Sequence, residues 1–84
     1  MGEIDIIGWD NGYLVFFEVK KRAGNGMSKA SYAVNYTKQK QICKTALGYL
    51  TCKGFPMDTA IRFDVIAIDG EEINWYKNAF AYVG

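Results

Sequence analysis

The sequence contains no histidine, only two cysteines and a single proline. Without histidine, Ser-His and Cys-His catalytic pairs are excluded. A zinc site is also disfavoured, because only Cys43 and Cys52 supply soft ligands. These cysteines lie nine positions apart in one predicted helix. At about 100° per residue they point to opposite faces and cannot form a disulfide with each other. Any catalysis must therefore rest on carboxylates, lysines and a metal ion.

A large net charge is also missing. Lys plus Arg number 10 and Asp plus Glu number 9, which gives a formal charge of +1. Attraction to a nucleic acid must therefore come from local clusters of positive side chains. No apolar run approaches the roughly 18 residues of a membrane span, and no cleavable leader precedes the first predicted strand. With neither feature, we expect a soluble cytoplasmic protein. Its 84 residues allow a single domain, residues 1–84, and an apolar content of 50% with 15% aromatic residues predicts that this domain is globular.

The local patterns predict a mixed α/β fold. Asn11-Gly12 is typical of a type I′ hairpin turn, because both residues tolerate positive φ. Gly54 is expected to end the helix, and the glycines between the hairpin and the helix indicate a loop. The predicted elements are strands at 3–9 and 13–21, a helix from 35–37 to 53, a strand at 61–68 and a short strand at 73–76.

The predicted hairpin brings charged side chains together. With a two-residue loop, paired positions sum to 23, which places Asp5 opposite Glu18. Alternation then divides the side chains between two faces. One face carries Glu3, Asp5, Ile7, Phe16, Glu18 and Lys20, and the other carries Ile4, Ile6, Val15, Phe17 and Val19. The second face is wholly apolar, so we expect it to be the main core face, covered by the helix or extended by a neighbouring strand.

Two opposed carboxylates with Cβ atoms about 4.5–5.5 Å apart repel each other and need compensation. Lys20 supplies part of it, and a divalent cation would supply more. Hard oxygen ligands on adjacent strands suit Mg²⁺, and a lysine beside the ion can orient the attacking water. A solvated face with the ion pairs Glu3–Lys20 and Glu18–Lys20 explains the same pattern. The pattern alone does not decide between these two interpretations.

Two further groups of residues interrupt the apolar pattern. Arg62 and Asp64 share one face of the strand at 61–68, where a structural ion pair is expected and a supporting role behind the candidate site is the alternative. Trp9, Trp75 and Tyr76 offer surfaces on which bases can stack, but packing inside the domain or at an interface is the preferred interpretation for all three.

Four segments resemble, in order, the YraN-like family of uncharacterised proteins, which are predicted endonucleases. The segments are GEIDIIGWDNGYLVFFEVKKR, YAVNYTKQKQICKTALGYL, IRFDVIAID and NAF. The family is similar to Holliday-junction resolvases within the PD-(D/E)xK nuclease superfamily. The resemblance implies a restriction-endonuclease-like mixed β-sheet core of hairpin, helix, strand and short strand. It also implies an endonuclease that uses Mg²⁺ or Mn²⁺ to hydrolyse phosphodiester bonds in DNA, including branched or structured DNA.

The resemblance assigns roles to individual residues. The implied catalytic residues are Asp5, Glu18 and Lys20, and the implied metal ligands are Asp5, Glu18 and the backbone carbonyl of Val19. On the helix, Gln39 and Lys38 match positions that face a phosphate in the superfamily. Lys21 and Arg22 extend the positive surface toward DNA, as does Lys29 in the following loop.

The chain departs from the family at its N-terminus, where it lacks the helix and edge strand that usually precede GEID. Such an N-terminally shortened sheet has an open edge, which favours pairing between chains. We therefore expect a homodimer or higher homo-oligomer, with exchange of segments between protomers as one route. The alternative function is a non-catalytic nucleic-acid-binding or assembly module with a vestigial nuclease site.

Overall fold

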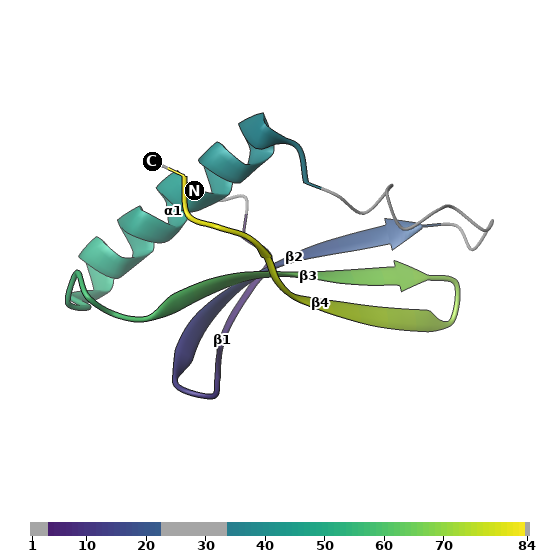
Figure 1. Cartoon of the computed structure of the whole chain (residues 1–84), viewed down its shortest axis with the longest axis horizontal. Helices are drawn as coiled ribbons and strands as arrows, with labels where there is room; N and C mark the ends of the chain where they lie inside the picture. Colours follow the sequence, from purple (N-terminus) through teal and green to yellow (C-terminus); the bar gives the residue numbers. More distant parts are fainter. Residues whose placement is uncertain (1–3, 23–33, 84) are drawn as a thin grey trace.

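One helix covers one face of a four-stranded sheet in the computed structural model, which describes residues 4–22 and 34–83 and leaves the side chain of Arg22 aside (Figure 1). The strand order is β1-β2-β3-β4. β2 and β3 run parallel, whereas the two outer pairs are antiparallel. The elements are β1 (Ile6–Asp10), β2 (Tyr13–Arg22), α1 (Tyr36–Lys53), β3 (Ile61–Asp69) and β4 (Glu72–Phe80). The predicted mixed α/β class is confirmed, and it is consistent with a restriction-endonuclease-like core.

The hairpin has the predicted turn and register. Asn11 and Gly12 both have positive φ, 51° and 83°, as a type I′ turn requires. The pairs run from Asp10↔Tyr13 to Ile6↔Phe17, so each sums to 23. β1 starts at Ile6, later than predicted.

β4 is longer than predicted. It spans nine residues, because a register shift lets the strand continue past Asn78, whose φ is 55°. The pairing with β3 resumes at Phe63↔Phe80. The extension carries the chain back over β3, and the segment after β4 then reaches the flank of α1 (Figure 1).

Local capping fixes both ends of α1 as predicted. Asn35 is the N-cap, and its side-chain oxygen accepts a hydrogen bond of 2.8 Å from the Lys38 backbone N–H. Gly54 follows the last turn in the left-handed conformation, with φ of 76°. No helix in the described ranges is long and apolar enough to span a membrane. The helix residues buried against the sheet are Ile42, Cys43, Ala46 and Leu50, with Tyr49 partly buried.

The two cysteines lie on opposite sides of α1, as predicted. Cys43 is fully buried, Cys52 is exposed, and both thiols are free. Burial raises the pKa of the Cys43 thiol above its ordinary value. Cys43 therefore remains a protonated, unreactive part of the core.

α1 packs on the sheet face that bears Phe16 and Glu18, so the predicted main core face is wrong. Parallel pairing sets Phe16 beside Phe63 and Glu18 beside Val65. The rings of Phe16 and Phe63 stack with centroids 5.7 Å apart. The buried core cluster comprises Leu14, Phe16, Val34, Ile42, Cys43, Ala46, Leu50, Phe63 and Val65.

The distribution of polarity along the hairpin explains this error. Asp5, Glu18 and Lys20 all lie at the open end of the hairpin, whereas Leu14 and Phe16 make the same face apolar near the turn. β3 extends the apolar part with Phe63 and Val65, which the hairpin sequence does not contain. The core therefore ends at the position where Glu18 begins, and the charged residues border it.

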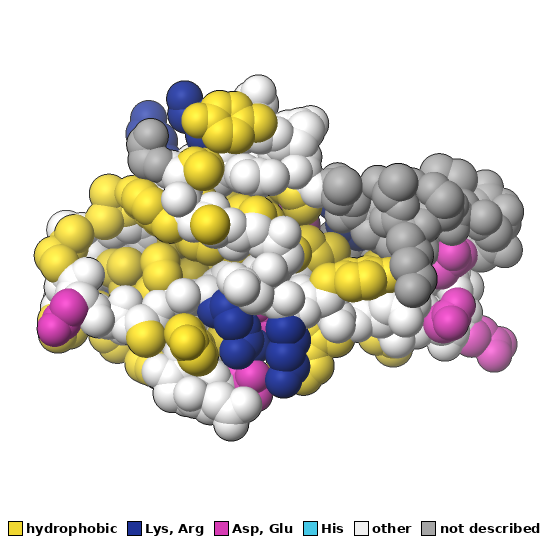
Figure 2. Space-filling model, viewed as in Figure 1, with side chains coloured by type: hydrophobic (Ala, Val, Ile, Leu, Met, Phe, Trp, Pro, Cys, Tyr) yellow, Lys and Arg dark blue, Asp and Glu magenta, His cyan; other side chains and the backbone are white. Residues whose placement is uncertain are grey.

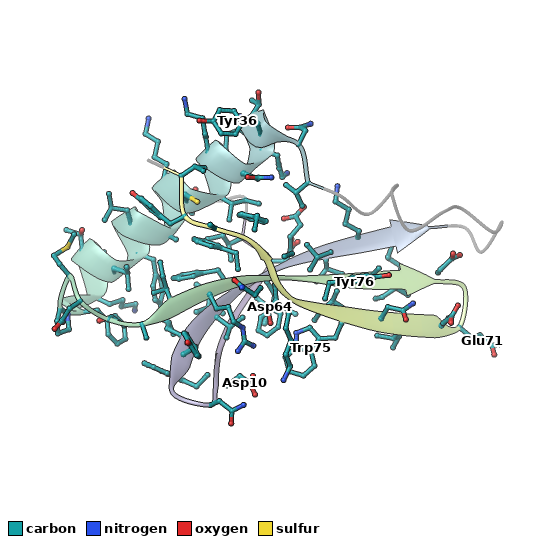
Figure 3. The ribbon with its side chains drawn as sticks, viewed as in Figure 1. Asp10, Tyr36, Asp64, Glu71, Trp75 and Tyr76 are labelled. Carbon is teal, nitrogen blue, oxygen red and sulfur yellow. The ribbon has the colours of Figure 1, made fainter. Side chains whose placement is uncertain are left out.

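The opposite sheet face has no helix over it in the described residues. Strand pairing and alternation place on it Ile6, Val15, Phe17, Val19, Ile66, Ile68, Ile73 and Trp75. Ile73 is 67% exposed, Ile6 49% and Trp75 46%. We call this surface the helix-free face; Figure 3 shows Asp10, Asp64 and Trp75 on this side of the sheet.

Candidate functional site

Two hydrogen bonds attach Asp5 to the β2 backbone on either side of Glu18. Its backbone N–H donates to the Phe17 carbonyl oxygen at 3.2 Å. Its carboxylate oxygen Oδ2 accepts a bond of 2.9 Å from the Val19 backbone N–H. Phe17 and Val19 are the neighbours of Glu18 along β2, so Asp5 contacts both sides of the Glu18 position.

The break in the β1–β2 ladder explains why the Asp5 side chain reaches the backbone of β2. The last regular pair is Ile6↔Phe17, and the Asp5 carboxylate then takes the place of a main-chain acceptor for Val19. The N–H and C=O groups of a strand residue point toward the same neighbouring strand. The Val19 carbonyl therefore faces the same side of β2 as the Asp5 carboxylate.

Glu18 lies at the edge of the core under the first turn of α1. Only 9% of its surface is exposed. The Lys38 ammonium Nζ lies 3.7 Å from Glu18 Oε2. An ionised carboxylate at such a position needs a nearby positive charge, and Lys38 supplies it together with the positive end of the α1 dipole. Lys38 is thus a direct partner of the candidate carboxylate.

Lys20 lies on the same face as Glu18. The register pairs Glu18 with Val65 and Lys20 with Ala67, and Val65 and Ala67 are both buried on the face that α1 covers. Lys20 itself is partly exposed at the open end of β2. The structure therefore brings Asp5, Glu18 and Lys20 to one corner of the sheet.

The predicted nucleic-acid contacts differ in how they are placed. Gln39 uses a side-chain N–H to bind the Val34 carbonyl at 2.8 Å, which holds the entry to α1. Its amide has a second N–H donor for a phosphate. Lys21 is exposed at the end of β2. The side chain of Arg22, together with Glu3, Lys29 and Tyr32, lies outside the described residues.

The donor set fits a hard divalent cation. Asp5, the residue just before β1, and Glu18, in β2, offer carboxylate oxygens, and Val19 of β2 adds a backbone carbonyl. Mg²⁺ prefers a small number of such oxygens and completes its coordination with water or phosphate. The β2 backbone holds Glu18 and Val19, and the Val19 amide fixes the orientation of the Asp5 carboxylate.

A second charged cluster lies on the helix-free face around Asp64. The predicted Arg62–Asp64 pair is confirmed, with Arg62 Nε and Nη2 each 2.9 Å from a carboxylate oxygen. The Trp75 indole N–H donates to Asp64 at 2.7 Å, and the Asn78 backbone N–H donates at 2.9 Å. Asp64 is fully buried. It therefore fixes the position of Trp75 and the irregular stretch of β4.

Sequence reasoning missed Asp10 in this cluster. Arg62 Nη2 lies 2.9 Å from Asp10 Oδ2, and the Lys77 ammonium lies 3.3 Å from the same oxygen. The Arg62 hydrogen bond holds the pKa of Asp10 below its ordinary value. Burial alone would raise the pKa of Asp64, but its hydrogen bonds from Arg62, Asn78 and Trp75 lower it overall. The cluster is a structural network on the other side of the sheet from Glu18.

Of the three aromatic residues, only Tyr76 packs into the domain, whereas Trp9 is 62% and Trp75 46% exposed and each contacts one other ring. The Trp9 ring lies 6.0 Å from Phe55, and the Trp75 ring lies 6.1 Å from Phe17. Tyr76 is partly buried against the core. None of the three is placed beside Asp5 and Glu18 by these contacts.

Comparison with known proteins gives one consistent family. A family model described as uncharacterised protein family UPF0102 matches residues 1–68. A UPF0102 protein of Lachnoclostridium phytofermentans is 44% identical over 84 residues, which cover 100% of this chain and 71% of the relative. One of Thermodesulfovibrio yellowstonii is 44% identical over 81 residues, 94% of this chain and 69% of the relative. A UPF0102 protein of Francisella tularensis subsp. novicida is 43% identical over 82 residues, which cover 98% of this chain and 70% of the relative. The chain therefore belongs to the UPF0102 family, the YraN-like family that its four motifs resemble.

Proposed function

We propose that this protein is a divalent-metal-dependent endonuclease that hydrolyses phosphodiester bonds in DNA, including branched or structured DNA. The observation that carries the proposal is the pair of hydrogen bonds that attach Asp5 to β2 at Phe17 and Val19, the two neighbours of Glu18. Lys20 on the same face completes the D…E-x-K arrangement of the PD-(D/E)xK superfamily. Asp5 is exposed and Lys20 is partly exposed, so a phosphate can approach these two side chains, whereas Glu18 lies deeper, with 9% of its surface exposed.

Each residue has a distinct task in this proposal. Asp5, Glu18 and the Val19 carbonyl would hold Mg²⁺ or Mn²⁺. When bound, such an ion polarises the phosphate and favours deprotonation of water near neutral pH. Lys20 orients the water oxygen that attacks phosphorus and offsets the charge that develops on the phosphate. Lys38 stays against Glu18 and balances its charge, while the second amide N–H of Gln39 and the ammonium of Lys21 contact flanking phosphates.

Dependence on a divalent ion is the direct test. We expect the protein to nick a four-way junction, a single strand or a duplex in Mg²⁺ or Mn²⁺, and to be inactive in EDTA. Ca²⁺ should support binding of DNA without cleavage. The measurement is separation of end-labelled products on a denaturing gel.

Two outcomes would contradict the proposal. The first is cleavage that continues undiminished in EDTA. The second is absence of cleavage with either ion on all three substrates while DNA binding persists. The second outcome would favour the alternative, a non-catalytic binding module.

We also propose that the protein is a homodimer that associates through the helix-free face. Ile73, Ile6 and Trp75 are each about half or more exposed there, which is more apolar surface than an α/β sheet normally leaves to water. Among the described strands, β1 and β4 are the edges, and unpaired edges add a second route to association by exchange of segments.

Replacing apolar residues of the helix-free face with charge tests the dimer. Wild type should have twice the 9.5 kDa mass of one chain in light scattering. The double variant Ile6→Glu/Ile73→Glu should have the mass of one chain, because a charge in an apolar interface is not compensated. Met57→Glu is the matched control, since Met57 is 77% exposed in a loop. A wild-type monomer at every concentration would refute the assembly.

A further inference from the structure

α1 bears only positive charge in this nearly neutral protein. The helix carries Lys38, Lys40, Lys44 and Lys53 and contains no acidic residue, although the whole chain has nine Asp and Glu. Figure 2 shows positive side chains over α1, a second positive group below it over the sheet, and negative side chains at the turn between β3 and β4. α1 therefore presents a positive surface that the formal charge of +1 conceals.

A groove lies along the outer flank of this helix. The segment after β4 runs beside α1 (Figure 1), and the Val83 backbone N–H donates to Cys43 Sγ at 3.4 Å, which fastens it there. The groove between this segment and the helix has a volume of about 650 Å³. Its principal lining residues are Tyr36, Lys40, Lys44, Leu47, Tyr82 and Val83.

The groove combines two ammonium groups with two open aromatic rings. Tyr36 is 61% exposed and Tyr82 is 48% exposed. The Lys40 ammonium lies 5.5 Å from the centroid of the Tyr36 ring, which keeps the two side chains together at the surface. Lys40 and Lys44 lie one helical turn apart, about 6 Å along the axis, and so face the groove in a row. Figure 3 shows Tyr36 on the outer side of α1, away from the sheet.

We infer that this groove is a binding site for a single-stranded nucleic acid, with phosphates against Lys40 and Lys44 and bases stacked on Tyr36 and Tyr82. A positive groove lined with exposed aromatic rings is the arrangement by which proteins bind single strands without reading sequence. A duplex keeps its bases stacked inside and offers no ring to the tyrosines. An acidic peptide would engage the lysines but leave the tyrosine rings unused, so the observations favour the single strand.

The groove is separate from the Asp5–Glu18 corner. Lys38 points to Glu18, and Lys40 lies two positions later, about 200° around the helix. The groove residues therefore occupy the other side of α1. Binding there requires no metal ion and no hydrolysis, so the inference goes beyond the proposed nuclease activity and does not depend on it.

The experiment is fluorescence anisotropy of labelled oligothymidylate with the full chain in EDTA. Lys40→Gln/Lys44→Gln should weaken binding about tenfold at low salt. It should also make the slope of log K against log salt shallower by about 1.4, because each lost phosphate contact on a single strand contributes about 0.7. Tyr36→Leu/Tyr82→Leu should weaken binding at least about tenfold with little change in salt slope, because stacking is lost while the charge remains.

A matched control variant distinguishes binding in this groove from non-specific attraction between the lysines and the oligonucleotide. Lys53→Gln/Lys77→Gln removes the same charge elsewhere and should retain wild-type affinity. Circular dichroism verifies that each variant folds. The inference is overturned if the two lysine pairs weaken binding equally, or if the tyrosine variant binds as wild type does. It is also overturned if polyglutamate displaces the oligonucleotide at equal charge concentration. Because EDTA is present throughout, failure of cleavage cannot be mistaken for failure of this site.

Discussion

Lys20→Met is expected to lower the rate of DNA cleavage about 10²–10⁴-fold while leaving the protein folded and able to bind DNA. This is the effect of removing a side chain that acts on a proton or on developing charge in the transition state. Methionine keeps the length of the apolar stem beside Ala67, so the packing of β2 against β3 is retained. The measurement is single-turnover cleavage in Mg²⁺ at saturating protein.

Substitution of a proposed metal ligand should also slow cleavage, but its defect should respond differently to Mn²⁺. Asp5→Asn keeps an oxygen that accepts from the Val19 N–H, so the hairpin retains its geometry while a metal-binding charge is lost. We expect a fall of at least about 100-fold in rate, and partial recovery at high Mn²⁺. Lys20→Met should not recover with Mn²⁺, because its defect does not lie in binding the ion.

Two control variants define the contradictory outcomes. Lys53→Met and Asp58→Asn change exposed residues far from the corner and should cleave at the wild-type rate. If the Lys20 and Asp5 variants cleave as fast as these controls, the assigned residues do not carry the activity. If the Lys20 and Asp5 variants lose both cleavage and their circular dichroism signal, loss of folding explains the result. Glu18→Gln then replaces them as the test variant, and a thermal melt verifies that it folds before its cleavage rate is measured.

The sequence predicted the parts of the structure that short-range chemistry determines. Asn11-Gly12 permits only a narrow set of turns, so it predicted the register of β1 and β2 as far as Ile6↔Phe17. The regular pairing ends there, and Asp5 is attached to β2 by its side chain. Asn35 and Gly54 cap the helix with their own neighbours, and their positions were correct for the same reason. The Arg62–Asp64 pair also lies within one strand.

The predictions that were wrong, and the contacts that were not predicted, depend on segments far apart in the sequence. Whether α1 covers the Phe16 face depends on β3 bringing Phe63 beside Phe16, and no local pattern in the hairpin contains that information. The Lys38–Glu18 pair needs the placement of the helix over the sheet. Asp10 meets Arg62 from 52 positions away. Hairpin polarity alone therefore assigned the core to the wrong face, although the candidate residues Asp5, Glu18 and Lys20 do gather at the open end of the hairpin.

Asp64→Asn is expected to lower the free energy of unfolding more than substitution of Asp5, Lys20 or Asp58. The Asp64 oxygens accept four hydrogen bonds, from Arg62 Nε and Nη2, Trp75 Nε1 and the Asn78 N–H. Asparagine replaces one of these oxygens with an NH₂ group. Because each oxygen accepts from two donors, this group cannot accept either bond, and two buried donors lose their acceptor. Removing one charge from such a buried pair costs about 3 kcal/mol or more. For a domain of this size that lowers Tm by roughly 12 °C or more.

The pH dependence of the Tm difference identifies the carboxylate as the cause. The pKa of Asp64 is lowered in the folded protein, so its stabilisation is complete above the ordinary Asp pKa of the unfolded chain, about 3.9. It is lost as the pH falls through the lower folded value. The Tm gap between wild type and Asp64→Asn should therefore be constant from pH 7 to pH 5 and narrow toward pH 3. Asp58→Asn, an exposed control, should change Tm little at any pH. A gap that is small at pH 7, or that widens on acidification, would show that Asp64 does not hold β3 and β4 together.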